Sequence, residues 1–189
     1  MDRRTPTLRL TLGLAAILSL AAAGPRAKDP TPPPAPAGFA WKSVASIKAA
    51  FLVPDGWFFK EELRKDVRGI FISKESIDQS GRFETGLTVN VFKNKKDAPA
   101  RARQYIAEQA QGGDVVNLWE QENGALKLYG ARLHVTHDPP AFTEHVLAIG
   151  NGKTDTLYVL MFESPDKTWD EAWKKGEVML KDFRLDDDI

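Results

Sequence analysis

The sequence predicts an α+β fold, an α-β-α sandwich in which helices flank a central antiparallel sheet of about six strands. Between residues 39 and 165, apolar residues mostly recur with the period of two that is typical of strands. Residues 157–162 are apolar without interruption, and a strand of this kind is buried on both faces. Helical patterns at residues 98–111 and from Thr168 onward supply the two covering layers.

The first 27 residues have the pattern of a secretory signal peptide. Three arginines precede the apolar run 10–23, and small residues follow it. The run has 14 residues, whereas a helix needs about 20 to span a bilayer. We therefore expect cleavage after Ala23 or Ala27 and a secreted or periplasmic protein. The alternative is an uncleaved anchor helix.

Residues 28–38 form a Pro-rich linker ahead of one globular domain at residues 39–189. Half of the 12 prolines lie between residues 25 and 36, where they favour an extended tether. Residues 1–27 hold four Arg and one Asp, so the rest of the chain has a net charge of −3, although the whole sequence is neutral. Neither balance suggests a nucleic-acid partner, and we expect no stable membrane insertion after cleavage.

The first half of the domain reads as short strands joined by tight turns. Pro54-Asp55-Gly56 is a turn signal, because Pro suits the second position of a turn and Gly tolerates positive φ. The mixed charges at residues 60–68 fit an exposed strand end or hairpin. The expected strands are residues 49–53, a strand opening at 57, and residues 69–73 and 86–92.

The second half is expected to be a helix followed by a meander of hairpins. Ala102, Tyr105, Ile106 and Ala110 form one stripe of a helix at residues 98–111, which Gly112-Gly113 ends. Asn123-Gly124 predicts a type I′ hairpin turn, and further turns are expected at residues 138–141 and 151–152. The strands between these turns are residues 115–122, 125–137, 142–150 and 156–163.

A capping box is predicted at the start of the last helix. Thr168 and Glu171 have the spacing at which a hydroxyl and a carboxylate satisfy unpaired backbone donors. The apolar residues that follow recur every three or four positions, so this helix face is expected to cover the sheet. They are Trp169, Ala172, Trp173, Gly176, Leu180 and Phe183.

The domain resembles PsbP-like and Mog1-like domains over about residues 40–185. The Phe-Leu-Val-Pro-Asp-Gly-Trp string at 51–57 is similar to the opening of that family, a strand followed by Pro and Gly-Trp. The string Tyr-Val-Leu-Met-Phe-Glu-Ser at 158–164, the Trp-rich helix and Lys-Asp-Phe-Arg-Leu at 181–185 resemble its ending. The resemblance implies a binding or assembly subunit without catalytic residues, whose relatives bind a small GTPase or the lumenal face of photosystem II.

The composition excludes several kinds of chemistry. The chain has no Cys, which excludes disulfides, thiolate zinc sites, Fe–S clusters and lipidation of an N-terminal Cys. The sequence lacks a Gly-x-Ser-x-Gly motif, and Gly112-Gly113 ends a helix, whereas a phosphate-binding loop opens one. We therefore expect no enzyme and no cofactor. A hydrolase built on a carboxylate pair stays open as an alternative, because 26 acidic residues offer many pairs.

The three histidines fall in one predicted hairpin. If residues 138–141 form a four-residue loop, His134 lies opposite His145 and His137 lies opposite Phe142. Two opposed imidazoles at His134 and His145 could hold a transition-metal ion such as Zn²⁺ or Cu²⁺. The alternatives are a partly exposed polar pair and a pH-responsive surface.

These observations favour an exported, non-catalytic binding protein of the bacterial cell envelope. Its expected partner is another envelope protein, and Trp119 and His137 are the residues expected to contribute to a partner surface. A periplasmic small-ligand or metal-binding protein is the main alternative. The oligomeric state does not follow from the sequence.

Overall fold

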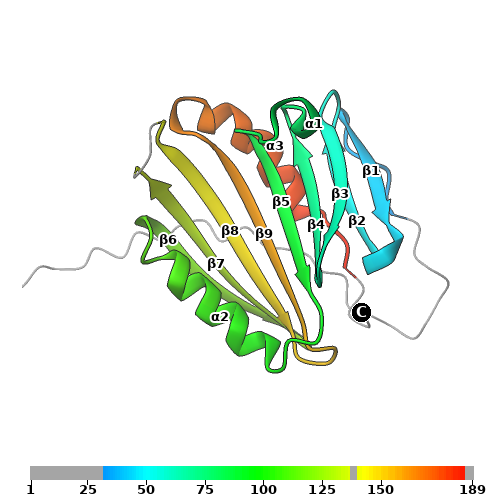
Figure 1. Ribbon diagram of the computed structural model, residues 1–189, viewed down its shortest axis with the longest axis vertical. Helices are drawn as coiled ribbons and strands as arrows, with labels where there is room; N and C mark the ends of the chain where they lie inside the picture. Colours follow the sequence, from blue (N-terminus) through cyan, green and yellow to red (C-terminus); the bar gives the residue numbers. More distant parts are fainter. Residues whose placement is uncertain (1–31, 137–139, 186–189) are drawn as a thin grey trace, which may run out of the picture.

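The computed structural model describes residues 32–136 and 140–185, and in this part of the chain nine strands form two sheets (Figure 1). β1 (Phe39–Val44) and β2 (Ala49–Pro54) pair as a separate antiparallel hairpin. The other strands form one antiparallel sheet in the order β3-β4-β5-β9-β8-β7-β6. They are β3 (Phe58–Arg64), β4 (Val67–Ser73), β5 (Gly86–Phe92), β6 (Asp114–Asn123), β7 (Leu126–Val135), β8 (Phe142–Asn151) and β9 (Thr156–Pro165).

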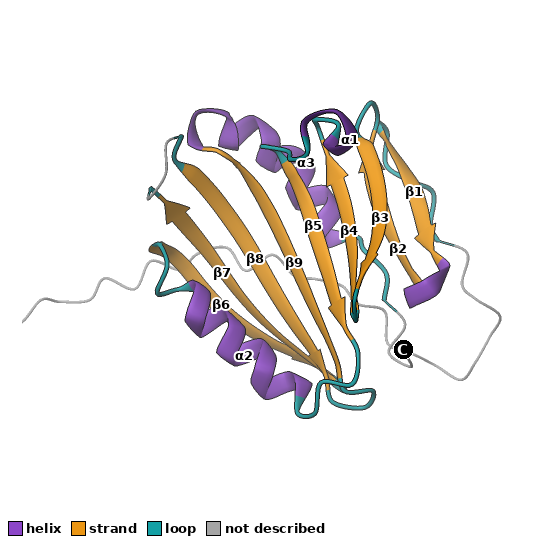
Figure 2. Ribbon diagram, in the orientation of Figure 1, coloured by secondary structure: helices purple, strands orange, loops and turns teal. Residues whose placement is uncertain are grey.

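Helices cover opposite faces of the large sheet, as Figure 2 shows. α2 (Ala98–Gln109) lies over β7, β8 and β9 on one face. α3 (Trp169–Lys181) and the β1–β2 hairpin cover the other face. α1 (Ile77–Ser80) is a single turn between β4 and β5. The predicted α+β class and α-β-α layering are confirmed, with seven strands in the sheet where about six were expected.

The central position of β9 agrees with its uninterrupted apolar run. β9 lies between β5 and β8, and both α2 and α3 contact it. Its alternate side chains therefore enter two separate cores. Tyr158, Leu160 and Phe162 join the larger core beneath α3, and Leu157 and Val159 join the core beneath α2.

Both predicted helix stripes are buried against the sheet. On α2, Ala102 and Ile106 are buried and Tyr105 packs against the same core. α2 approaches β8 so closely that a Cβ atom on Gly150 would lie 2.4 Å from the backbone oxygen of Ala98. On α3, the buried residues are Trp169, Ala172, Gly176, Met179 and Leu180.

Two details of the predicted turns and caps are wrong. Asn123 is the last residue of β6 and pairs with Leu126, so the two-residue hairpin loop is Gly124-Ala125, with Gly124 at φ +57°. Thr168 is the N-cap residue of α3 but makes no capping hydrogen bond. A 3₁₀ turn at Asp166–Thr168 precedes the helix, and the Thr168 hydroxyl donates to the Pro165 carbonyl at 3.1 Å.

The described end of the Pro-rich segment packs on the domain. The indole Nε1 of Trp41 donates to the carbonyl of Pro33 at 2.7 Å, and Ala35 lies against the larger core. The predicted leader, residues 1–27, lies outside the described residues. Within the described ranges, no helix is both long enough and apolar enough to cross a membrane.

Candidate binding surface

β6 is an edge strand of the large sheet, and much of its side-chain surface is open to solvent. Val115, Val116 and Leu118 have exposed fractions of 45%, 61% and 53%. They are three of the five large apolar side chains that are exposed in the described part of the chain. An exposed edge with apolar side chains is a template for pairing with another chain, so β6 is the leading candidate for a binding surface.

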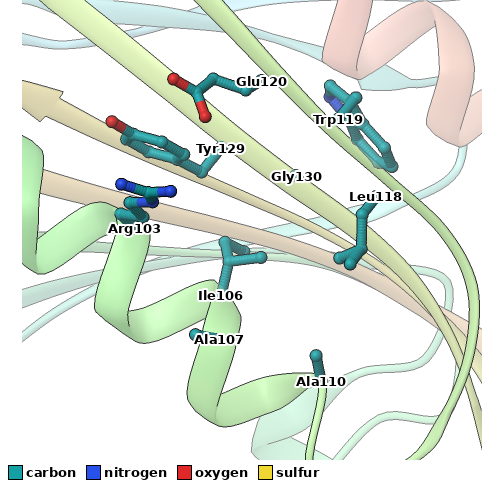
Figure 3. A pocket seen from close by; sticks show the side chains of 9 residues that line it. All are labelled: Arg103, Ile106, Ala107, Ala110, Leu118, Trp119, Glu120, Tyr129 and Gly130. Carbon is teal, nitrogen blue, oxygen red and sulfur yellow. The ribbon is translucent and has the colours of Figure 1, made fainter.

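A shallow open groove of about 380 Å³ lies between α2 and β6 (Figure 3). The wall formed by α2 is apolar and consists of Ile106, Ala107 and Ala110 (Figure 3). Leu118 projects into the groove from β6 (Figure 3). The polar groups at its margin are Arg103, Glu120 and the Tyr129 hydroxyl. The groove and the exposed strand therefore form one continuous surface, which we call the β6 edge surface.

The charge of β6 has one sign. Asp114, Glu120 and Glu122 are its only charged residues. Glu122 accepts a hydrogen bond from Lys127 of β7 at 2.8 Å, and exposure of both side chains makes this ion pair weak. Glu120 has no ion-pair partner among the described residues. The β6 edge surface thus combines exposed apolar groups with an acidic margin.

The opposite edge strand of the sheet, β3, carries charged residues that are paired with charges on neighbouring elements. Lys60 donates to Asp78 of α1 at 2.7 Å, and Arg68 of β4 donates to Glu61 at 2.6 Å. Charged residues on an edge strand disfavour pairing with another chain. β3 still exposes Leu63, with an exposed fraction of 64%, and this residue provides a matched control for experiments on β6.

Trp119 is among the residues that line the groove (Figure 3), but its indole ring packs on the opposite face of the sheet, against His145. It pairs with Gly130 across the strands, and a Cβ atom on Gly130 would lie 2.1 Å from the indole ring. The indole stacks on His145 with ring centroids 4.7 Å apart, and His145 stacks on Trp173 at 4.5 Å. Trp119 is therefore half-buried in a column of rings, and its predicted part in a partner surface stays a prediction.

The register predicted for the histidine hairpin is wrong by two residues. His134 pairs with Thr143, and His145 pairs with Arg132. The connection between β7 and β8 comprises residues 136–141, two residues more than the predicted four-residue loop. The shift by two leaves His134 and His145 on one sheet face but separates the pair that the predicted metal site requires.

Each of these two imidazoles bonds to another group. His134 Nε2 bonds to the carboxylate of Asp166, which also accepts a hydrogen bond from the Thr143 hydroxyl at 2.7 Å. Arg132 Nη2 donates to Nδ1 of His145 at 3.2 Å, since a guanidinium only donates. Among the described residues, no three His, Asp or Glu side chains are placed to hold a metal ion. His137 lies outside the described residues.

A half-buried guanidinium, that of Arg132, lies beside the ring column. Arg132 lies over Trp173 at 4.4 Å and over Trp169 at 5.3 Å, and its Nε has no hydrogen-bond partner among the described residues. Cation–π contact with two indoles compensates part of the lost hydration. Burial, and then the charge of Arg132, lower the pKa of His145 to about 3, so His145 is neutral at neutral pH.

Two carboxylates oppose each other on the α2 side of the sheet. Glu144 of β8 pairs with Glu163 of β9. Burial, and then the charge of Glu144, raise the pKa of Glu163 to about 7. Burial also raises the pKa of Glu144, and burial with the charges of Glu144 and Glu108 raises the pKa of Tyr105. Neither carboxylate is among the residues that line the groove between α2 and β6.

The position of β6 at the edge of the sheet was not predicted from the sequence. Residues 115–122 were correctly predicted as a strand, but its place at the edge depends on the order of strands that are distant in sequence. One local signal was present: Val115 and Val116 are adjacent, which breaks the period of two. The register between β6 and β7 shifts at this point, between Val115 and Asn117, as expected for a β-bulge.

Comparison with known proteins identifies the fold. No family model and no curated protein sequence matches the chain. Cyanobacterial PsbP from Synechocystis sp. PCC 6803 has a similar structure, with a TM-score of 0.52 and 14% identity over 88% of this chain and 99% of PsbP. The predicted resemblance is therefore confirmed at the level of the fold, which is PsbP-like.

Two further structures share less of the geometry. The Ran-binding protein Mog1p of Saccharomyces cerevisiae has a TM-score of 0.48 and 11% identity over 78% of this chain and 95% of its own. A protein from Bacteroides thetaiotaomicron VPI-5482 has a TM-score of 0.45 and 10% identity over 73% of this chain and 45% of its own.

Proposed function

We propose that this protein is an exported, non-catalytic accessory protein of the bacterial cell envelope that acts by binding another protein through the β6 edge surface. The observation that carries the proposal is the exposure of Val115, Val116 and Leu118 beside the groove along α2. The PsbP-like fold and the leader pattern at residues 1–27 support a binding role outside the cytoplasm.

The exposed apolar groups on β6 favour protein binding over a structural role. Buried apolar side chains stabilise the fold, whereas exposed ones leave apolar area in contact with water that a partner can cover. Val116 occupies the bulge and is the most exposed of the three, so it packs least against its own domain. A partner that covers these side chains gains apolar burial without requiring rearrangement of the core.

Site-specific crosslinking in the native envelope tests the proposal. A photoreactive amino acid at Val116 is expected to capture a reproducible partner. The same group at Leu63 on the opposite edge is expected to capture none, although Leu63 is equally exposed. Absence of a product from Val116, or the same products from both positions, would contradict the proposal.

Loss of the apolar groups gives a second prediction. The double substitution V116S and L118S is expected to abolish the crosslinked product when the photoreactive group is placed at Val115. Both side chains are more than half exposed, so we expect the free energy of unfolding to change by no more than about 1 kcal/mol. Chemical denaturation checks the second point, and an undiminished product in a stably folded variant would argue against the β6 edge surface.

A further inference from the structure

We infer that the partner segment is an extended peptide that adds antiparallel to β6 as an eighth strand, with two basic side chains opposite Glu122 and Glu120. The inference rests on the proposed function and names the chemistry of the partner. It follows from the unpaired edge, the order of side chains along β6, and the sign of its charge.

The backbone of β6 can accept another strand. Beyond the bulge, residues 117–123 pair with β7 in an unbroken register, from Asn117 opposite Arg132 to Asn123 opposite Leu126. No described strand pairs with the outer side of β6. The amide and carbonyl groups that point outward from alternate residues therefore need a partner chain or water, and an extended peptide supplies complementary groups.

The side chains of β6 define what the added strand carries. Leu118 pairs with Ala131 and Glu120 pairs with Tyr129, and both of these partners belong to the core beneath α2. Glu122 is two residues beyond Glu120, so all three side chains share the sheet face that α2 covers. An antiparallel strand meets Glu122 first, then Glu120, then Leu118. Its complementary sequence is therefore basic-x-basic-x-apolar, and the apolar side chain lies over Leu118 at the mouth of the groove.

A second copy of this chain fits the edge poorly. The antiparallel register that brings two Leu118 side chains together also places Asp114 of each copy opposite Glu122 of the other. Like charges directly opposite each other destabilise a strand pair. β6 carries no basic residue that could compensate. A basic partner strand meets the same carboxylates with attraction, so charge complementarity selects it over self-association.

Synthetic peptides test the inference with the purified protein. The probe is Thr-Lys-Thr-Lys-Val-Leu-Thr, whose two lysines fall opposite Glu122 and Glu120 when it adds antiparallel. A peptide with Glu in both Lys positions tests the contribution of charge. The Lys peptide is expected to bind at least about tenfold more tightly than the Glu peptide, and its affinity is expected to fall with added salt.

A charge-reversed variant and hydrogen exchange locate the binding. The double variant E120K and E122K is expected to prefer the Glu peptide, because both side chains are exposed and their reversal leaves the core unchanged. The Lys peptide is expected to slow amide exchange at residues 117–123 and not at residues 58–64 of β3. Equal binding of the Lys and Glu peptides, or protection elsewhere, overturns the inference.

The outcomes separate this inference from the proposed function. If crosslinking at Val116 captures a partner but no peptide binds, the binding surface stands and the strand-addition chemistry is wrong. If Val116 crosslinks to a second copy of the chain, the inference that the partner strand is basic is wrong. If neither crosslinking nor peptide binding occurs, both proposals fail.

Discussion

Replacing Gly150 by alanine is expected to lower the free energy of unfolding by about 3 kcal/mol. The added Cβ atom would lie 2.4 Å from both the backbone oxygen of Ala98 and the backbone nitrogen of Pro99. These atoms belong to the first turn of α2, so a side-chain rotation cannot relieve the clash. The helix must move away from β8, and Ala98 and Ala102 then lose part of their burial.

Gly152 provides the matched control for this prediction. A Cβ atom there would come no closer than 3.5 Å to the Pro99 side chain, which is ordinary van der Waals contact. We expect G152A to change stability by no more than about 0.5 kcal/mol. Urea denaturation of both variants measures the difference, and equal stabilities would show that α2 does not pack on β8 as closely as described.

The substitution E163Q is expected to stabilise the protein at pH 8 by about 2–3 kcal/mol and to have little effect near pH 4.5. The pKa of Glu163 is raised from its ordinary value of 4.5 to about 7, chiefly by burial. Below pH 4.5 the carboxyl group is protonated in both the folded and the unfolded chain. Between pH 4.5 and 7 the folded chain binds the proton more strongly, so stability falls as pH rises.

Measurements of stability across pH separate this effect from other changes. The difference between E163Q and the unsubstituted protein should grow from pH 4.5 to about pH 7 and then level off. The variant E144Q is expected to move this transition to lower pH, because the charge of Glu144 is the second cause of the raised pKa. Parallel stability curves for E163Q and the unsubstituted protein would contradict the burial of this carboxylate.

Local pattern was enough to predict most of the elements. The stripe of Ala102 and Ile106, the Gly124 hairpin region and the apolar run of β9 each depend on residues close together in the sequence. The α-β-α layering followed from β9, since a strand buried on both faces needs two covering layers. The opposition of Glu144 and Glu163 did not follow from the predicted turn at residues 151–152, because Asn151 pairs with Thr156 and the loop comprises residues 152–155.

The candidate site could not be predicted in the same way. The position of β6 at the sheet edge depends on β5 pairing with β9, which no local pattern indicates. The histidine register failed because two extra residues in one loop move His134 from His145 to Thr143. Trp119 was correctly placed in a strand, but its contact with Gly130 depends on the β6–β7 register beyond the bulge.

The pairing of β5 with β9 also has a consequence for the order in which the chain folds. All of α2 and the strands β6, β7 and β8 lie between these two partners in the sequence. The middle of the sheet therefore cannot close until the chain is nearly complete, and such distant contacts make folding slow. A chain that folds late remains unfolded during synthesis, and an unfolded chain is compatible with the proposed export across a membrane. Without cysteines, its folding on the far side of a membrane would need no oxidant.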